Sequence, residues 1–321
     1  NTAASSAKEF AQSTSAGGAC RFPDVIAYSG EEQRMQTIFI ISGAAIDITG
    51  KPESTCRERD SNLGKVRIRV GGVGYNIARR LAALNYGAEL VTALGSGYHA
   101  SMVRESCAGE NVSLRHTLTS TEHTGTYIGV FDEDGDMLVG ISDMSVLDHL
   151  TPKYLAKLLP EINAAAMCVI DGNLSPASLE YLCTHVTSPL FYDPVSCAKA
   201  KRIGGNIGKC YAIKPNRFEA GFLSGKSCDT VRGIYRASDW FLDQGVKRVF
   251  ISLGEEGVFW ADPDNCGVIP AECLGIADIS GAGDAMGAAI IDGCVRGLST
   301  EDCARLGNAA SARTFAQEPQ V

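Results

Sequence analysis

From Thr37 onward, short apolar segments that end in polar or glycine residues alternate with helical stretches. The apolar segments are TIFIISGAAID, ELVTAL, MCVIDGN, LFYDP, YAIKPN and RVFISLG. Strands that are apolar throughout and separated by helices are typical of a parallel sheet that helices cover on both faces. The sequence therefore predicts an α/β fold, and we expect its first strand to end at Asp47.

Polar or glycine residues follow each predicted strand. In open α/β sheets the ligand crevice lies beyond the carboxyl ends of the strands. We therefore expect the residues at these ends to converge on one site: Asp47, Asp171, Asn173, Asp193, Asn216 and Gly254.

Two segments interrupt the alternation of strands and helices. Residues 49–70 contain KVRIRV, and residues 124–142 have the sequence TGTYIGVFDEDGDMLVGIS, with two alternating strands around an Asp-Gly turn. Period-two alternation next to such a turn predicts a small, separate sheet. Three interpretations stay open: a lid over the crevice, a dimer contact, or an edge hairpin without a role.

The composition favours a small substrate. A net charge of −8 argues against a basic surface for nucleic acid. The twelve cysteines form no C-x-x-C pair, which indicates buried, reduced thiols in an intracellular protein rather than disulfides or a zinc site. No apolar run approaches the roughly 20 residues that span a bilayer. We expect a cytoplasmic location, with an organellar one left open, and no membrane partner.

Residues 1–36 differ in composition from the rest. They begin with a Ser-, Ala- and Gly-rich stretch that lacks the apolar region of a secretory signal. We expect a flexible leader here, with a linker from an upstream domain as the alternative. Residues 37–321 are predicted to form the main domain.

The segment from Asp278 to Asp284, DISGAGD, is followed by the small-residue helical run AMGAAIIDGCV. Small residues at Gly281, Ala282 and Gly283 let backbone N–H groups approach an anion, and a helix N-terminus adds roughly half a positive charge. A carboxylate at this position can accept the proton of an attacking hydroxyl, so Asp284 is a candidate catalytic base. The alternative is a helix N-cap.

The segment GGVGYN, residues 71–76, opens a second helix, IARRLAALNYG. It lacks the dinucleotide-binding pattern because position 77 is Ile rather than Gly, which argues against a nicotinamide cofactor. Gly71 and Gly72 would let a ligand lie against the backbone, and Asn76 offers a donor and an acceptor for sugar hydroxyls. A plain tight turn is the alternative.

The segment Gly225-Lys226-Ser227 resembles the end of a phosphate-binding P-loop. Its required first glycine would fall at Ala220, and a helical pattern rather than a strand precedes it. We predict a glycine at a helix C-terminus with a solvated lysine, without a nucleotide role.

Together and in this order, GGVGYN and DISGAGDAMGAA resemble the paired motifs of the phosphofructokinase-B or ribokinase family. The resemblance continues through KPNRFEAGFLSG at 214–225 and ISLGEEGVFW at 251–260. It implies a ribokinase-like three-layer sandwich with a mostly parallel central sheet, a small β-sheet lid, and the use of ATP with Mg²⁺. Within the family, GAAIDITG, DEDGDMLVGISDM and YDPVSCAKAKRI are similar to the pseudouridine kinases.

The resemblance also implies a role for particular residues. Asp284 is the catalytic base, assisted by the backbone of Gly281, Ala282 and Gly283. The acceptor is held by Asp47, Gly71, Gly72, Asn76, Asp143, Asn173 and Lys199. ATP is held by Asn216, Glu219, Ser252, Gly254, Gly257 and Asn308. Magnesium is organised through water by Asn216 and Glu219, and Asp278 supports a monovalent cation such as K⁺.

The activity that the resemblance implies is transfer of the ATP γ-phosphoryl group to the 5′-hydroxyl of pseudouridine, giving pseudouridine 5′-phosphate. A ribokinase or another sugar or nucleoside kinase of this family is one alternative. A nucleoside-binding protein that has lost catalysis is another. The implied partners are a second copy of the chain, bound through the lid, and a fused domain that cleaves pseudouridine phosphate as a glycosidase.

Overall fold

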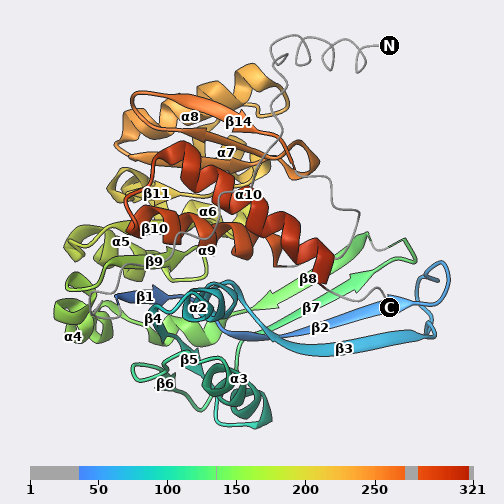
Figure 1. The fold of residues 1–321 in the computed structure, drawn as a ribbon. Helices are drawn as coiled ribbons and strands as arrows, with labels where there is room; N and C mark the ends of the chain where they lie inside the picture. Colours follow the sequence, from blue (N-terminus) through green and yellow to red (C-terminus); the bar gives the residue numbers. More distant parts are fainter. Residues whose placement is uncertain (1–35, 135, 272–280, 318–321) are drawn as a thin grey trace, which may run out of the picture. The chain divides into compact units, whose positions relative to one another are not determined.

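A computed structural model describes residues 36–134, 136–271 and 281–317. Its central sheet has eight strands: β1 (Thr37–Ile41), β4 (Gly87–Val91), β9 (Met167–Asp171), β10 (Leu190–Asp193), β11 (Ala212–Ile213), β12 (Arg248–Ser252), β13 (Val258–Ala261) and β14 (Cys266–Ile269). Their order is β14-β13-β12-β11-β10-β9-β1-β4 (Figure 1). The six strands from β12 to β4 are parallel, and β13 and β14 are antiparallel. The predicted mostly parallel sheet is confirmed.

Helices cover both faces of this sheet. One face packs against α2 (Val73–Ala83), α3 (Tyr98–Gly109), α9 (Ala282–Val295) and α10 (Thr300–Gln317). The other packs against α4 (Pro152–Asn163), α5 (Pro176–His185), α7 (Arg217–Ser224) and α8 (Val231–Gln244). The remaining short elements are α6 (Cys197–Ala200), β5 (Ala93–Leu94), β6 (Leu118–Thr119) and the 3₁₀ helices η1 (Ser145–His149), η2 (Lys201–Lys209) and η3 (Gly254–Glu256).

The apolar strands explain why two helical layers form. In β1, Ile38 and Ile40 are buried against the α2 side, whereas Phe39 and Ile41 are buried against the α4 side. Successive side chains of a strand point to opposite faces, so an uninterrupted apolar strand needs cover on both. Each such side chain contributes about 1.5–3 kcal/mol when it is fully buried.

A smaller sheet consists of β2 (Ala45–Pro52), β3 (Gly64–Gly71), β7 (Thr126–Phe131) and β8 (Met137–Asp143), in the order β3-β2-β7-β8. Figure 1 shows these strands extending away from the central sheet. The chain therefore has an α/β fold with a second, smaller sheet, as the sequence predicted.

The first predicted strand, TIFIISGAAID, is in fact two strands in different sheets. The chain leaves the central sheet after Ile41, and Asp47 lies within β2 of the smaller sheet. The segment between the two strands forms hydrogen bonds with residues outside them. The carbonyl of Gly43 accepts a hydrogen bond from the amide of Gly74 at 3.0 Å, and the amide of Ala44 donates to Oγ1 of Thr92 at 3.3 Å. Asp47 is therefore not at the carboxyl end of a central strand.

Helix boundaries follow the local sequence. The side chain of Thr151 caps α4 ahead of a first-turn proline, and Ser175 caps α5 in the same way. Gly245 ends α8 in a left-handed conformation. Among the helices of the described ranges, none is both long and apolar enough to cross a bilayer.

Candidate active site

Helix α9 begins at the glycine-rich segment. Gly281 is its N-cap, with φ +85°, a backbone conformation that glycine adopts without strain. No described side chain caps this end of the helix. The first-turn amides of α9, from Ala282 and Gly283, are therefore positioned to bind an anion, and the helix dipole favours negative charge there.

Asp284 lies in the first turn of α9, directly beside those amides. Its Oδ2 accepts a hydrogen bond of 2.8 Å from Nδ2 of Asn76 in α2. The two glycine-containing segments thus meet in space although 208 positions separate these residues. The N-cap interpretation of Asp284 is wrong, because Gly281 occupies that position.

Burial and the charge of Asp193 raise the pKa of Asp284 to about 6, against the lowering effects of the Asn76 hydrogen bond and of Lys214. A carboxyl group with this pKa is mostly ionised at neutral pH and is a stronger base than an ordinary aspartate. Asp284 can therefore accept a proton from a hydroxyl group held against it.

Lys214 supplies the positive charge in this part of the molecule. Its Nζ lies 3.0 Å from Oδ2 of Asp193, and both side chains are buried. Burial lowers the pKa of Lys214, but the carboxylates of Asp193, Glu219 and Asp284 together outweigh it and raise that pKa. One ammonium group therefore faces three carboxylates. The sequence analysis missed Lys214, although a lysine directly after the apolar YAI of a strand was a usable indication.

Asn216 and Glu219 form a capping box at the start of α7. The amide of Asn216 donates to Glu219 Oε2, and the amide of Glu219 donates to Asn216 Oδ1, both at 2.9 Å. Burial, with the charge of Asp193, raises the pKa of Glu219 to about 7, and Lys214 opposes this shift. The capping box uses Oε2, which leaves Oε1 for another partner.

The oxygen ligands near α9 fit a magnesium ion that is held mainly by phosphates and water. Within the described residues, no cluster of three or more His, Cys, Asp or Glu side chains is arranged as a metal site. Mg²⁺ in phosphoryl-transfer sites usually takes only one or two carboxylates, along with waters and substrate phosphates. Glu219 and Asp193 are carboxylates of the kind it requires. Asp278, the expected monovalent-cation residue, lies outside the described residues.

Asp47, one of the residues predicted to hold the acceptor, packs against Gly71. A Cβ built on Gly71 would lie 2.6 Å from Cγ of Asp47, and Gly72 has φ +92°. Burial raises the pKa of Asp47 to about 6, and the neighbouring Arg69, directly opposite in β3, acts against this. The carboxylate of Asp47 and the glycine backbone thus form one surface.

Lys199 links the smaller sheet to the central one. Its Nζ donates to Oδ1 of Asn173 at 2.6 Å and to Oγ of Ser142 in β8 at 3.0 Å. Asn173 in turn donates to Asp171, which also accepts a 2.5 Å hydrogen bond from Ser42. Asp171 is fully buried, and its hydrogen bond with Asn173 fixes the orientation of the Asn173 side chain.

The residues expected around ATP lie at the end of β12 and beside β14. Ser252 forms a parallel bridge with Asn216, and Gly254 follows with φ +65°. A Cβ on Gly257 would lie 2.6 Å from the amide nitrogen of Ala271. Asn308 in α10 donates to the carbonyl of Pro270 at 2.8 Å. Gly257 therefore packs closely against the backbone that follows β14, and Asn308 forms a hydrogen bond with it.

Asp143 lies apart from this group. It ends β8 on the opposite face of the smaller sheet from Asp47, and it is exposed. Its Oδ1 accepts hydrogen bonds from the amide and hydroxyl of Ser145, at 3.1 and 2.7 Å, which lowers its pKa. An acceptor role for Asp143 stays a prediction.

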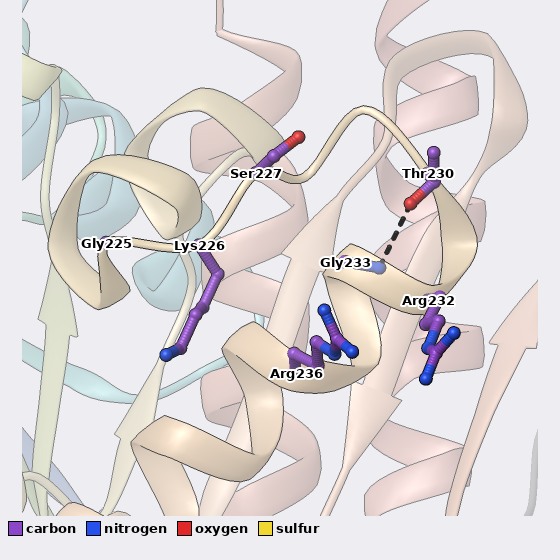
Figure 2. A pocket seen from close by; sticks show the side chains of 7 residues that line it. All are labelled: Gly225, Lys226, Ser227, Thr230, Arg232, Gly233 and Arg236. Atoms are coloured by element: carbon purple, nitrogen blue, oxygen red, sulfur yellow. Dashed lines mark hydrogen bonds between the residues drawn. The ribbon is translucent and has the colours of Figure 1, made fainter.

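The Gly225-Lys226-Ser227 segment is a helix terminus, as predicted. Gly225 ends α7 with φ +66°, and Lys226 is exposed. A cavity of about 270 Å³ lies beside this segment. Figure 2 shows the side chains that line it and the hydrogen bond that the amide of Gly233 donates to Oγ1 of Thr230. The cavity is lined by Gly225, Lys226, Ser227, Thr230, Arg232, Gly233 and Arg236. None of the predicted ATP or acceptor residues lines it.

Comparison with known proteins identifies the family and the fold. Residues 35–318 match the model of the pfkB family of carbohydrate kinases. The chain belongs to this family. Its members are phosphotransferases that act on alcohol groups and use ATP with Mg²⁺. The predicted family is thereby confirmed, and the observed layers are those of its ribokinase-like fold.

Three members or structures show the extent of the similarity. The chain is 31% identical to a pseudouridine kinase of Escherichia coli over 284 residues, which are 88% of this chain and 91% of that protein. A ribokinase structure from Thermotoga maritima superposes with a TM-score of 0.78 at 19% identity, covering 88% and 94% of the two chains. The Arabidopsis thaliana ribokinase complexed with ribose and ATP gives a TM-score of 0.77 at 21% identity, with the same coverage.

Proposed function

We propose that this kinase transfers the γ-phosphoryl group of ATP to the 5′-hydroxyl of pseudouridine. The observation that carries the proposal is the hydrogen bond between Asn76 and Asp284. It joins the side chain proposed to bind the sugar to the proposed catalytic base, at a helix N-terminus that no described side chain caps. The similarity to the pseudouridine kinase of Escherichia coli supports the choice of acceptor.

In the proposed reaction, Asp47 and Asn76 hold ribose hydroxyls, and Asp284 accepts the proton of the attacking 5′-hydroxyl. The amides of Ala282 and Gly283 donate to the oxygens of the transferring group. Glu219 and Asn216 would hold, through water, a magnesium ion bound with ATP, and this ion would neutralise phosphate charge. Because the transition state of phosphoryl transfer is loose, positioning and electrostatic stabilisation supply most of the acceleration.

The test is Asp284→Asn, assayed by ADP release and by calorimetric binding of pseudouridine. Loss of a general base lowers kcat by about 10²- to 10⁴-fold. Nucleoside binding stays close to that of the wild type, since the asparagine can still accept from Asn76. Asp243→Asn, in an exposed position of α8, is the matched control. Wild-type turnover in the Asp284 variant would remove the proposed role.

A panel of acceptors separates the alternatives. Turnover of ribose or another nucleoside in preference to pseudouridine would identify a different member of the same family. Binding of a nucleoside without ADP release in the presence of Mg²⁺ would identify an inactive binding protein. The cytoplasmic location and the glycosidase fusion stay predictions, because the described residues bear on neither.

We also propose that the smaller sheet is a lid through which two copies of the chain pair. Four isoleucines lie directly opposite one another on the face turned away from Asp47: Ile68, Ile48, Ile128 and Ile141. Ile68 is 53% exposed and Ile141 is 60% exposed. Ile128 is 40% exposed, whereas Ile48 is partly buried against the core. Exposed apolar side chains gathered on one face of a sheet are typical of an interaction surface.

A further inference from the structure

The opposite face of the smaller sheet carries a tyrosine beside the proposed acceptor residues. Tyr127 in β7 lies directly between Asp47 in β2 and Ser142 in β8, so the three side chains share a face. Asp47 packs against Gly71, and Ser142 accepts a hydrogen bond from Lys199. Tyr127 is therefore on the side of the sheet that faces the acceptor residues.

Two glycines lie beneath the ring of Tyr127. Gly129 and Gly140 are paired directly across β7 and β8. A Cβ on Gly140 would lie 2.6 Å from the hydroxyl of Tyr127, and one on Gly129 would lie 3.2 Å from its Cε1. Any larger residue at Gly140 would lift the ring off the sheet.

The position of the ring is held from its hydroxyl end. Tyr127 Oη donates to Sδ of Met137 at 3.0 Å. On the far side of Gly129 lies the ring of Phe131, 3.0 Å from a Cβ built on that glycine. Tyr127 thus lies against the sheet and is only partly buried, so the ring face turned away from the sheet can meet a planar ligand.

Hydrogen-bond donors lie at the edge of this aromatic surface. Lys199 uses two hydrogen bonds to reach Ser142 and Asn173, and an ammonium group has three donors. Such a donor suits the carbonyl oxygens of a heterocyclic base. A free sugar has no aromatic face to stack on Tyr127, whereas base–aromatic stacking is a general means of holding nucleobases.

We infer that Tyr127 is the stacking surface for the acceptor's base, with Lys199 at the base's edge, so that the site selects a nucleoside over a free sugar. This inference rests on the proposed kinase function and assigns its specificity to Tyr127, which the sequence analysis did not single out, together with the predicted acceptor residue Lys199. The group bound at Tyr127 and Lys199 is a planar heterocycle that bears carbonyl groups.

The experiment is steady-state kinetics with pseudouridine and ATP varied in turn, for Tyr127→Leu and Tyr127→Phe. Removing the ring raises the KM for pseudouridine by roughly 10- to 100-fold, the effect of one lost base–aromatic stack. The KM for ATP and kcat stay close to wild type. Tyr127→Phe keeps the ring and therefore keeps the low KM. Tyr98→Leu, at a position 78% exposed in α3, is the matched control.

Gly140→Ala provides a second variant that leaves Tyr127 intact. Because the new methyl group displaces the ring, the KM for pseudouridine rises as in Tyr127→Leu. The stacking role is overturned if Tyr127→Phe weakens nucleoside binding as much as Tyr127→Leu does. It is also overturned if the KM for ATP rises as much as the KM for pseudouridine. The kinase function stands in either case.

Failure of the proposed function has a different result. If the wild type does not phosphorylate pseudouridine, calorimetric binding of pseudouridine and uridine replaces turnover as the measurement. Nucleoside binding that is lost in Tyr127→Leu and kept in Tyr127→Phe supports the base subsite even then. The base subsite is overturned if the wild type binds neither nucleoside. It is also overturned if Tyr127→Leu binds both nucleosides as well as the wild type does.

Discussion

The carboxylate of Asp47 occupies the space that a side chain on Gly71 would need. A Cβ at position 71 would lie 2.6 Å from Asp47 Cγ, well inside contact distance. The two residues come from neighbouring strands of the smaller sheet, β2 and β3. Glycine at position 71 is therefore a condition for the orientation of Asp47, and through it for the proposed acceptor site.

Gly71→Ala should weaken acceptor binding without unfolding the protein. The methyl group forces Asp47 out of its place, so we expect the KM for the nucleoside to rise by about tenfold, the equivalent of one lost hydrogen bond to a charged group. The KM for ATP should not change. Gly50→Ala is the control. Gly50 lies in β2, as Asp47 does, and a Cβ on Gly50 would meet no atom within 4 Å. Equal kinetics for the two variants would contradict the role of Gly71.

The pH dependence of kcat/KM for the nucleoside should show the ionisation of two carboxyl groups, those of Asp284 and Asp47. Burial raises the pKa values of both Asp284 and Asp47 to about 6. A raised carboxyl pKa means that the proton is kept to a higher pH, so activity that needs both ionised groups falls as the pH drops through 6. The logarithmic slope on the acid side should approach 2.

Asp47→Asn should remove one of the two ionisations, so its acid limb should have a slope near 1. The residual activity of that variant is lower, but it remains measurable because Asp284 is intact. An unchanged slope of 2, or a limb centred near the ordinary aspartate pKa of about 3.9, would contradict the assignment.

The central strands were predictable because local sequence is enough to identify them. Apolar runs ending in polar residues correspond to β9, β10, β11 and β12. The sequence analysis missed the break after Ile41, although Ser42-Gly43 is a pair that commonly marks a turn or loop. What directs the chain into the second sheet is bonding to distant residues, from Gly43 to Gly74 and from Ala44 to Thr92.

The two glycine segments were predictable as the starts of two helices, but their contact was not. Asn76 and Asp284 are far apart in the chain, and only the packing of α2 beside α9 brings them together. Lys214 looked like an ordinary polar strand end. Tyr127 was part of an alternating strand, and the face it occupies depends on the register with β2 and β8, which the local sequence does not specify.

Lys214→Met should destabilise the protein, and more so at high pH. Without the ammonium group, the buried carboxylates of Asp193 and Glu219 lose their cation, which for a buried pair costs about 3–5 kcal/mol. The pKa of Glu219, which burial already raises to about 7, then rises further because Lys214 no longer opposes the shift. The folded state keeps its stability where this carboxyl group is protonated and loses stability as the pH increases. Urea unfolding at pH 5 and pH 8 measures the difference.

Two further variants define the cause of that loss. Lys226→Met, at an exposed lysine, should leave the unfolding free energy unchanged at either pH. Lys214→Met combined with Asp193→Asn should recover part of the stability at pH 8, because one uncompensated charge is gone. A loss for Lys214→Met that is the same at both pH values would show that packing, rather than charge, is what Lys214 contributes.

The isoleucine row on the outer face of the smaller sheet gives a test of pairing between two copies. A specific interface buries on the order of 1,000 Å² or more, and its apolar centre does not tolerate unpaired charges. Ile68→Lys combined with Ile141→Lys should therefore convert a dimer into monomers in sedimentation equilibrium at micromolar concentration. Leu84→Lys, at an exposed leucine that ends α2, should leave the dimer intact. Since both lysines face away from Asp47 and Tyr127, the double variant should still bind the nucleoside. A wild-type protein that sediments as a monomer would exclude pairing through this face.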